Sequence, residues 1–442
     1  MRVTRHFVTV GQRRVHYMRA GEGPAVCLLH ASPCSAKVLR VPQEVFAGRF
    51  TALAFDTPGF GLSDLLPIEQ PEIEDFADAL AETLTALGVE QTATYGRHTG
   101  ASIAVEFAVR HTARCAMALT DGFPVFSAKQ AEDRLNRYLL PIEPKWDGSH
   151  LVWLWFRYRD QHVFWPWHNQ SLAFRADADV PDADFIHRGV LELLEAGDGY
   201  RIGYSAAFRH RGLAILPELT VPVCFGNRPG DSQFRTMAQY PPEAWTAELP
   251  REALAAAAAE RALLLRHPAR GTPPAAPVAT PIAGRSTTNY LDVAGRQVLV
   301  RTIGDMHAAA PLVLAPHVPG SSALYETLIR ELGATMPVIA YDPPGHGESE
   351  PRSDGAQSPE VWAEALWGVC DALGVHAAHL IGHNAGAATA VATAGVTTIT
   401  TAGAMTVATT EAATAMTPAT TRATTRLRSN FLLPRTLGDP SC

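Results

Sequence analysis

The stretch Tyr95-Gly96-Arg97-His98-Thr99-Gly100 has the layout of a sharp turn between a β-strand and an α-helix. In a nucleophile elbow, small residues two positions before and two positions after a central side chain let the strand and the helix approach closely. The strained turn then holds the central side chain out over the sheet. Gly96 and Gly100 occupy the two small positions, where a Cβ atom would block the turn. The central residue is His98, so the elbow lacks its usual nucleophile.

Strands and helices alternate around this turn. Two apolar runs, 25–29 and 51–55, are typical of strands buried on both faces of a sheet. Residues 73–88 place apolar side chains at helical spacing and end in a glycine suited to a helix C-terminus. The elbow joins a strand over 92–95 to a helix over 101–108. This alternation predicts an α/β fold with a mostly parallel, doubly wound sheet that helices cover on both faces.

Composition limits the class of protein. A chain of 442 residues, 47% of them hydrophobic, can form two domains. The net charge of -7 argues against a nucleic acid or an anionic membrane as the main partner. The six cysteines show no metal-ligand spacing, so we expect reduced thiols, no metal site and no cofactor. Because the chain has neither a signal-peptide pattern nor a run of about 18 apolar residues, a cytoplasmic location without a transmembrane helix is expected.

Three motifs follow one another in the first part of the chain: His30-Ala31-Ser32-Pro33, Asp56-Thr57-Pro58-Gly59-Phe60-Gly61 and the elbow. In this order and at these separations they resemble the α/β-hydrolase superfamily, in particular its capped members such as proline-iminopeptidase-like, epoxide-hydrolase-like and haloalkane-dehalogenase-like proteins. The resemblance implies a sheet of α/β-hydrolase type over residues 1–268 with a helical cap at about 126–210. It also implies a hydrolase that acts on a small, partly apolar ester, amide or epoxide-like substrate.

The cap region is crowded with aromatic residues, eight of them between positions 146 and 167. Most of these rings are expected to pack the cap onto the core. Some of them must line the pocket above His98, and we take Trp153 and Trp165 as candidates.

The first motifs recur later in the chain. His317, Asp342, Gly374 and Asn384 follow His30, Asp56, Gly88 and His98 by 286 or 287 positions. A long offset that stays almost constant predicts a tandem repeat. We therefore expect a Pro/Ala linker over 269–286 and a partial second α/β-hydrolase-like domain over 287–390. Asn384 is neither a nucleophile nor a base, so the second copy is expected to be inactive.

The end of the chain breaks this pattern. From 391 to 442 it is rich in Ala and Thr and lacks the alternation that the fold requires. Two interpretations stay open: a low-complexity tail, or a frameshifted continuation.

A serine-type hydrolase needs a nucleophile, a base histidine, a carboxylate that orients the histidine, and backbone N–H groups that bind the oxyanion. Ser32 and Thr99 are placed to supply the N–H groups. Asp121 ends the strand next to the elbow strand, and Asp231 follows the strand after that. The nucleophile is missing, and the segment 247–252, where the resemblance places the base, contains no histidine.

A catalytic role for His98 itself is the first hypothesis. Strand tips lie about 4.8 Å apart, so the Asp121 carboxylate could reach one ring nitrogen of His98. The other nitrogen would then face the pocket as a general base for water. Ser102, one helical turn further on, should point along the helix. His30 is expected to be a structural residue hydrogen-bonded under the oxyanion loop.

The alternative is a catalytically inactive pseudo-hydrolase that binds a small ligand or a protein partner. Loss of the nucleophile together with loss of the base is what decay of a triad would produce. Turnover of a small-molecule substrate separates the two hypotheses.

Overall fold

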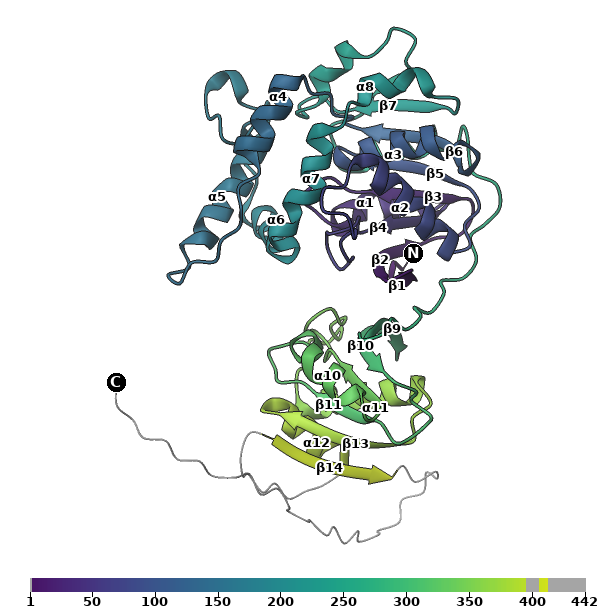
Figure 1. Cartoon of the computed structure of the whole chain (residues 1–442), viewed down its shortest axis with the longest axis vertical. Helices are drawn as coiled ribbons and strands as arrows, with labels where there is room; N and C mark the ends of the chain where they lie inside the picture. The colour runs from purple at the N-terminus through teal and green to yellow at the C-terminus, as the bar shows by residue number, and fades with distance from the viewer. Residues whose placement is uncertain (1, 395–404, 412–442) are drawn as a thin grey trace.

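The computed structural model describes residues 2–394 and 405–411, which form two units with a β-sheet each (Figure 1). The sheet of the first unit has eight strands in the order β1-β2-β4-β3-β5-β6-β7-β8. β1 and β2 form an antiparallel hairpin, β2 is antiparallel to β4, and all the remaining pairs are parallel. The predicted α/β fold with a mostly parallel sheet is thereby confirmed. The strands are Thr4–Val10 (β1), Arg13–Ala20 (β2), Ala25–Leu29 (β3), Thr51–Phe55 (β4), Thr92–Arg97 (β5), Cys115–Asp121 (β6), Val223–Asn227 (β7) and Thr246–Glu248 (β8).

Helices cover both faces of this sheet. Alternate side chains of a strand point to opposite faces, and in β3 Cys27 belongs to the core under α2 and α3, whereas Val26 belongs to the core under α1 and α9. Among the described residues, no helix combines the length and the apolar character needed to cross a membrane. The four helices are Arg40–Phe46 (α1), Ile73–Ala86 (α2), Thr99–Arg110 (α3) and Ala253–Leu264 (α9).

The chain between β6 and β7 forms a helical cap in the region where one is expected. At its centre the buried ring of Tyr138 contacts Trp165 at 5.4 Å and Phe208 at 5.4 Å between ring centroids. Most cap aromatics thus pack against the core, as expected, but Trp146 is fully exposed. The cap helices are Ala128–Asp133 (α4), Ser149–Val163 (α5), Ala183–Ala196 (α6), Tyr200–Arg209 (α7) and Gly212–Ile215 (α8).

Asp56, at the end of β4, connects three segments of the first unit. Its buried carboxylate accepts hydrogen bonds from His16 Nδ1 at 2.7 Å, from the Ala36 N–H at 2.8 Å and from the Leu62 N–H at 2.9 Å. Burial on its own would raise the pKa of Asp56, but the nearby His16 and His30 imidazoles and the Leu62 N–H lower it to about 2. The ionised carboxylate therefore stabilises the hairpin, the loop before α1 and the turn after β4 together.

The second unit repeats the strand order of the first. Its sheet runs β9-β10-β12-β11-β13-β14, which is the arrangement of β1 to β6. The two sheets differ at the sixth position, because β14 pairs antiparallel with β13 whereas β6 pairs parallel with β5. The elements are Thr287–Val293 (β9), Arg296–Ile303 (β10), Leu312–Ala315 (β11), Glu326–Gly333 (α10), Val338–Tyr341 (β12), Pro359–Ala372 (α11), Ala377–His383 (β13), Ala385–Ala394 (α12) and Met405–Glu411 (β14).

The bounds expected for the two domains, the linker and the tail stay predictions. No helix or strand is assigned over 269–286, where the linker is expected. Most of the expected tail over 391–442 lies outside the described residues, so both interpretations of it remain open.

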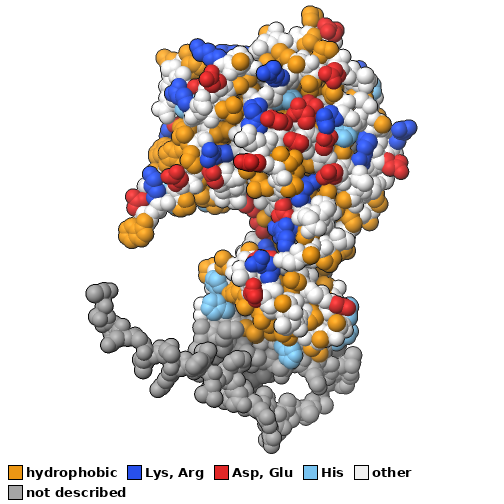
Figure 2. All heavy atoms as spheres, in the orientation of Figure 1, with side chains coloured by type: hydrophobic (Ala, Val, Ile, Leu, Met, Phe, Trp, Pro, Cys, Tyr) orange, Lys and Arg blue, Asp and Glu red, His pale blue; other side chains and the backbone are white. Residues whose placement is uncertain are grey.

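The two units contact each other through the edge of the first sheet. Phe7 in β1 stacks on Tyr290 in β9 with ring centroids 5.5 Å apart, and the Arg5 guanidinium lies 4.4 Å from the same tyrosine ring. Ion pairs surround these rings, among them Arg5 with Glu348 at 3.4 Å and Arg285 with Asp64 at 2.7 Å. Figure 2 shows charged side chains gathered where the units meet.

Replacing Gly96 by alanine should destabilise the first unit. A Cβ atom at this position would lie 2.0 Å from the backbone oxygen of Gly100, which the start of α3 holds in place. We expect the free energy of unfolding to fall by about 3 kcal/mol or more, the upper part of the range for overpacked sites. Gly48→Ala is the control, because its nearest neighbour would be 3.4 Å away. Urea unfolding of the full chain measures both, and equal midpoints for the two variants would contradict the prediction.

The stabilisation that the ionised Asp56 provides should be lost in acid. Because the pKa of Asp56 is lowered from 3.8 to about 2 by folding, its ionisation stabilises the protein above about pH 4. This contribution should disappear as the pH falls from about 4 to 2, and it amounts to about 2 kcal/mol. Urea unfolding of the wild type and of Asp56→Asn at pH 5 and pH 2.5 tests this. The two proteins should differ less at the lower pH, and a constant difference would refute the assignment.

Candidate active site

His98 sits in the strained turn that the sequence indicates. It joins β5 to α3 with φ 49° and ψ −111°, in a region that residues with a side chain rarely adopt. A Cβ atom on Gly100 would lie 2.1 Å from the backbone oxygen of Leu29, so the start of α3 presses against β3. The turn therefore places the imidazole above the ends of the parallel strands.

The imidazole of His98 is held by Asp231, which lies in the loop after β7. Nε2 of His98 is 2.9 Å from Oδ2 and 3.0 Å from Oδ1 of Asp231. Oδ1 also accepts the Gln233 N–H at 2.8 Å. Burial alone would raise the pKa of Asp231, but His98, Arg97 and the Gln233 N–H lower it well below its ordinary value. An ionised carboxylate can only accept, so Nε2 carries the proton.

The second nitrogen of His98 is free. Nδ1 has no hydrogen-bond partner among the residues that the structure describes, and the side chain is 31% exposed. Gly122 packs against the other side of the ring, where a Cβ atom would lie 2.7 Å from Cδ2 of His98. The ring is thus fixed between Gly122 and Asp231 with one nitrogen available for proton transfer.

The expected contact between Asp121 and His98 is wrong. The Asp121 carboxylate is completely buried and forms ion pairs with Arg228 at 2.8 Å and with Arg97 at 3.5 Å. Arg228 also contacts the buried Glu260 of α9 at 3.0 Å. Asp121 therefore points to the side of the sheet that α9 covers, where two arginines balance two carboxylates. Asp231 takes the role that the sequence analysis gave to Asp121.

Ser32 and Thr99 are the two residues expected to supply oxyanion donors. The N–H groups of Ser32 and Thr99 have no acceptor among the described residues. His30 fixes the first of these loops, since its Nδ1 donates to the Ala31 carbonyl at 2.9 Å and its Nε2 accepts the Thr57 N–H at 3.0 Å. Burial lowers the pKa of His30, which keeps it neutral. The geometry of His30 is that of the structural residue expected from the sequence.

The sequence motifs did not point to two residues near the site, His162 and Cys34. Burial lowers the pKa of His162 in the cap helix α5 to about 4, and the charges of Arg97 and His98 act in the same direction. His162 is therefore neutral at pH 7. Cys34, in the loop after β3, lies 4.0 Å from the Tyr158 hydroxyl, and burial raises its pKa to about 12. A protonated thiol is a poor nucleophile, so Cys34 does not replace the missing serine.

Other candidate groups lie away from His98. Ser102 is completely buried in α3, and its hydroxyl has no partner among the described residues. His267, beyond α9, packs against the ring of Trp245 at 6.1 Å. The segment 247–252 supplies no base because it contains no histidine.

A cavity of about 500 Å³ opens beside Asp231, between the cap and the loop after β7. Phe126 and Trp165 line it from the cap, and Gly230 and Thr236 line it from the loop. Trp165 thus lines a cavity of ligand size. Trp153 is not part of this cavity wall, and its ring packs edge-on against Trp167 at 6.2 Å. The prediction that both rings line a pocket above His98 stays a prediction, because His98 is not among the residues that line this cavity.

The second unit has an elbow with the same backbone. Asn384 has φ 51°, and a Cβ atom on Gly382 would lie 2.1 Å from the Gly386 oxygen. Its surroundings differ, because the Tyr325 hydroxyl lies 3.0 Å from Nδ1 of both His317 and His383.

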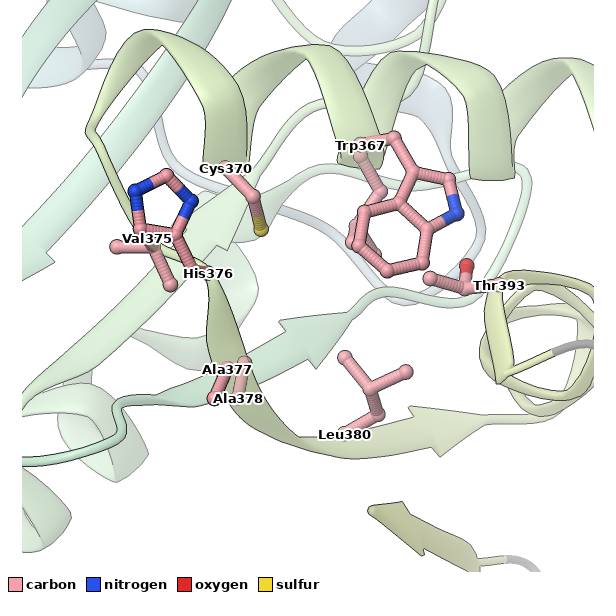
Figure 3. A pocket seen from close by; sticks show the side chains of 9 residues that line it. Trp367, Cys370, Val375, His376, Ala377, Ala378, Leu380 and Thr393 are labelled. Carbon is pink, nitrogen blue, oxygen red and sulfur yellow. The ribbon is translucent and has the colours of Figure 1, made fainter. Parts of the chain in front are cut away.

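The cavity drawn in Figure 3 belongs to this second unit and is small. Cys370 and His376 lie on one side of it, and Trp367 and Thr393 lie on the other. Its volume is about 10 Å³, enough for about one water molecule. It is a packing defect of the core, too small for a substrate.

Known proteins resemble parts of this chain. A family model described as alpha/beta hydrolase fold matches residues 310–432. Haloalkane dehalogenase 2 of Mycobacterium tuberculosis is 30% identical over 101 residues, which are 23% of this chain and 35% of that protein. Soluble epoxide hydrolase of a Corynebacterium species is 31% identical over 106 residues, 24% of this chain and 37% of that protein. The chain thus spans about a third of the length of these curated relatives.

Among solved structures, a bromoperoxidase from Bacillus anthracis aligns with a TM-score of 0.46 and 17% identity, over 59% of this chain and 99% of that one. The two sheets share their strand order, both elbows are framed by glycines, and the family model matches the second of them. The fold of the chain is that of the α/β-hydrolase superfamily, and the family model itself matches residues 310–432.

Proposed function

We propose that the first unit is a hydrolase in which the His98–Asp231 pair activates water. The observation that carries the proposal is the arrangement of His98, with Nε2 held by Asp231 at 2.9 Å and Nδ1 free. Imidazole is the side chain best suited to proton transfer near neutral pH. A carboxylate that fixes its tautomer is the usual way to orient it.

The proposed reaction has two proton transfers at Nδ1 of His98. Nδ1 takes a proton from water while the water oxygen adds to the carbonyl carbon of an ester. The carbonyl oxygen becomes an oxyanion that accepts hydrogen bonds from the N–H groups of Ser32 and Thr99. Nδ1 then returns the proton to the leaving alkoxide, and the products are an acid and an alcohol. Direct attack by water needs no covalent intermediate, which fits an elbow without Ser, Cys or Asp at its centre.

The substrate class follows from the cavity and from the relatives. Phe126 and Trp165 offer an apolar wall, which suits a small, partly apolar ester, amide or epoxide-like compound. The relatives include proteins named soluble epoxide hydrolase and haloalkane dehalogenase. An inactive ligand-binding protein is the second candidate function, and the histidine-free segment 247–252 favours it.

Replacing His98 should abolish hydrolysis. We expect His98→Ala to lower kcat/KM by about 10²–10⁴-fold, the usual contribution of a general base. The measurement is turnover of a panel of p-nitrophenyl esters, a lactone, an anilide and an epoxide by the full chain. Ser102→Ala is the matched control, because Ser102 is buried in the same helix and should leave turnover unchanged. Absence of turnover by the wild type on the whole panel would favour the inactive ligand-binding protein.

Replacing Asp121 should mainly lower stability, whereas replacing Asp231 should mainly lower turnover. Asp121→Asn leaves Arg97 and Arg228 with one buried carboxylate fewer, so we expect a loss of about 3 kcal/mol in the free energy of unfolding. Asp231→Asn should instead lower kcat by at least tenfold, because His98 loses the group that orients it. Urea unfolding and ester turnover on both variants test this. The assignment fails if Asp121→Asn lowers kcat more than Asp231→Asn does.

A further inference from the structure

The cavity beside Asp231 has an excess of positive charge on its walls. Its ionisable lining residues are Arg134, Arg175, Arg235, Arg251, Asp177 and Asp231. Both carboxylates already have cationic or donor partners, since Asp177 pairs with Arg251 at 3.0 Å and Asp231 binds His98 at 2.9 Å. The other three lining arginines, Arg134, Arg175 and Arg235, have no ion pair with either lining carboxylate.

Arg134 is the buried member of this group. It is 6% exposed, and its one ion-pair partner among the described residues is Asp133 at 3.2 Å. Asp133 is shared, because Arg137 at 3.4 Å and His168 at 3.1 Å contact the same carboxylate. Nε of Arg134 is buried and has no hydrogen-bond partner among the described residues. One carboxylate thus serves three groups, so Arg134 has no carboxylate to itself among the described residues.

The surroundings of Arg134 favour an anion rather than water. Its guanidinium lies 5.8 Å from the Trp165 ring and 5.9 Å from the Phe126 ring, and both rings line the cavity. Burial lowers the pKa of Arg134 in spite of Asp133. A desolvated guanidinium forms strong, often bidentate hydrogen bonds with carboxylate or phosphate oxygens.

The other cations come from two separate walls of the cavity. Arg175 lies in a cap segment that folds back on itself, where the Trp165 N–H donates to the Phe174 carbonyl at 2.9 Å. Arg235 lies across the cavity, in the helical turn Phe234–Gln239 after β7. Because these arginines have the same charge, their fields add at the cavity, which raises the local concentration of anions.

We propose that this cavity binds a substrate that carries an oxyanion group, a carboxylate or a phosphate, with Arg134 as its principal partner. The apolar part of the substrate lies against Trp165 and Phe126. The cavity volume of about 500 Å³ suits a ligand with one aromatic or short aliphatic body. This inference rests on the proposed function for calling the ligand a substrate, since Asp231 belongs both to the cavity wall and to the pair with His98.

Binding can be measured apart from turnover. The full chain is titrated by calorimetry at constant ionic strength with benzoate, phenyl phosphate and the neutral benzamide. We expect at least one anion to bind and benzamide not to bind. Arg134→Gln should weaken anion binding at least tenfold, because a charged hydrogen-bond partner is lost. Arg137→Gln is the matched control, since Arg137 contacts the same Asp133 but its side chain is 65% exposed.

The outcomes distinguish a carboxylate ligand from a phosphate ligand. They also distinguish the inference of anion binding from the proposed hydrolase. Binding of benzoate alone identifies a carboxylate substrate, and binding of phenyl phosphate alone identifies a phosphate. If Arg134→Gln fails to fold, Arg235→Gln replaces it, because Arg235 is exposed and should still weaken binding several-fold. The inference is overturned if no anion binds, if benzamide binds as well as benzoate, or if these variants bind like the wild type. Anion binding without turnover supports this inference and refutes the proposed hydrolase, and turnover of neutral esters without anion binding does the reverse.

Discussion

The close approach of α3 to β3 is the constraint on which the site depends. Cβ atoms at Gly96 and Gly100 would lie 2.0 and 2.1 Å from backbone oxygens, so two glycines are needed for the chain to pass from strand to helix. The same contact leaves the Thr99 N–H at the free start of the helix and puts His98 at a positive φ. Because Gly382 and Gly386 make the same approach around Asn384, the backbone of the elbow is independent of the residue it presents.

Features set by local geometry could be predicted from the sequence. The elbow, the buried strands and the structural role of His30 each follow from a few neighbouring residues. The choice between Asp121 and Asp231 could not be predicted, because both follow strands that end beside the elbow. It depends on Arg228, which meets Asp121 and Glu260 only in the fold and forms ion pairs with both. Asp231 is then the carboxylate that remains for His98.

The position of the cap in the chain could be predicted from the sequence, but the contacts of its side chains could not. Its aromatic content indicates packing, yet nothing in the sequence says that Trp165 reaches the cavity while Trp153 turns toward Trp167. The same holds for Arg134, whose importance comes from sharing Asp133 with Arg137 and His168. Such contacts form between cap segments that are far apart in the sequence, and the motifs of the sheet carry no information about them.

The second unit covers the edge strand β1. In β1 the Arg5 N–H donates to the side-chain oxygen of Gln297 at 2.7 Å, and the Gln297 amide donates to the Arg5 carbonyl at 2.8 Å. A side-chain amide thus satisfies one backbone position of an edge that would otherwise be open to pairing with another chain. Lys37 extends the contact to the cap, since it lies 3.3 Å from Glu195 of α6 and 3.6 Å from Glu348. Through these contacts the second unit covers part of the sheet edge and reaches the base of the cap.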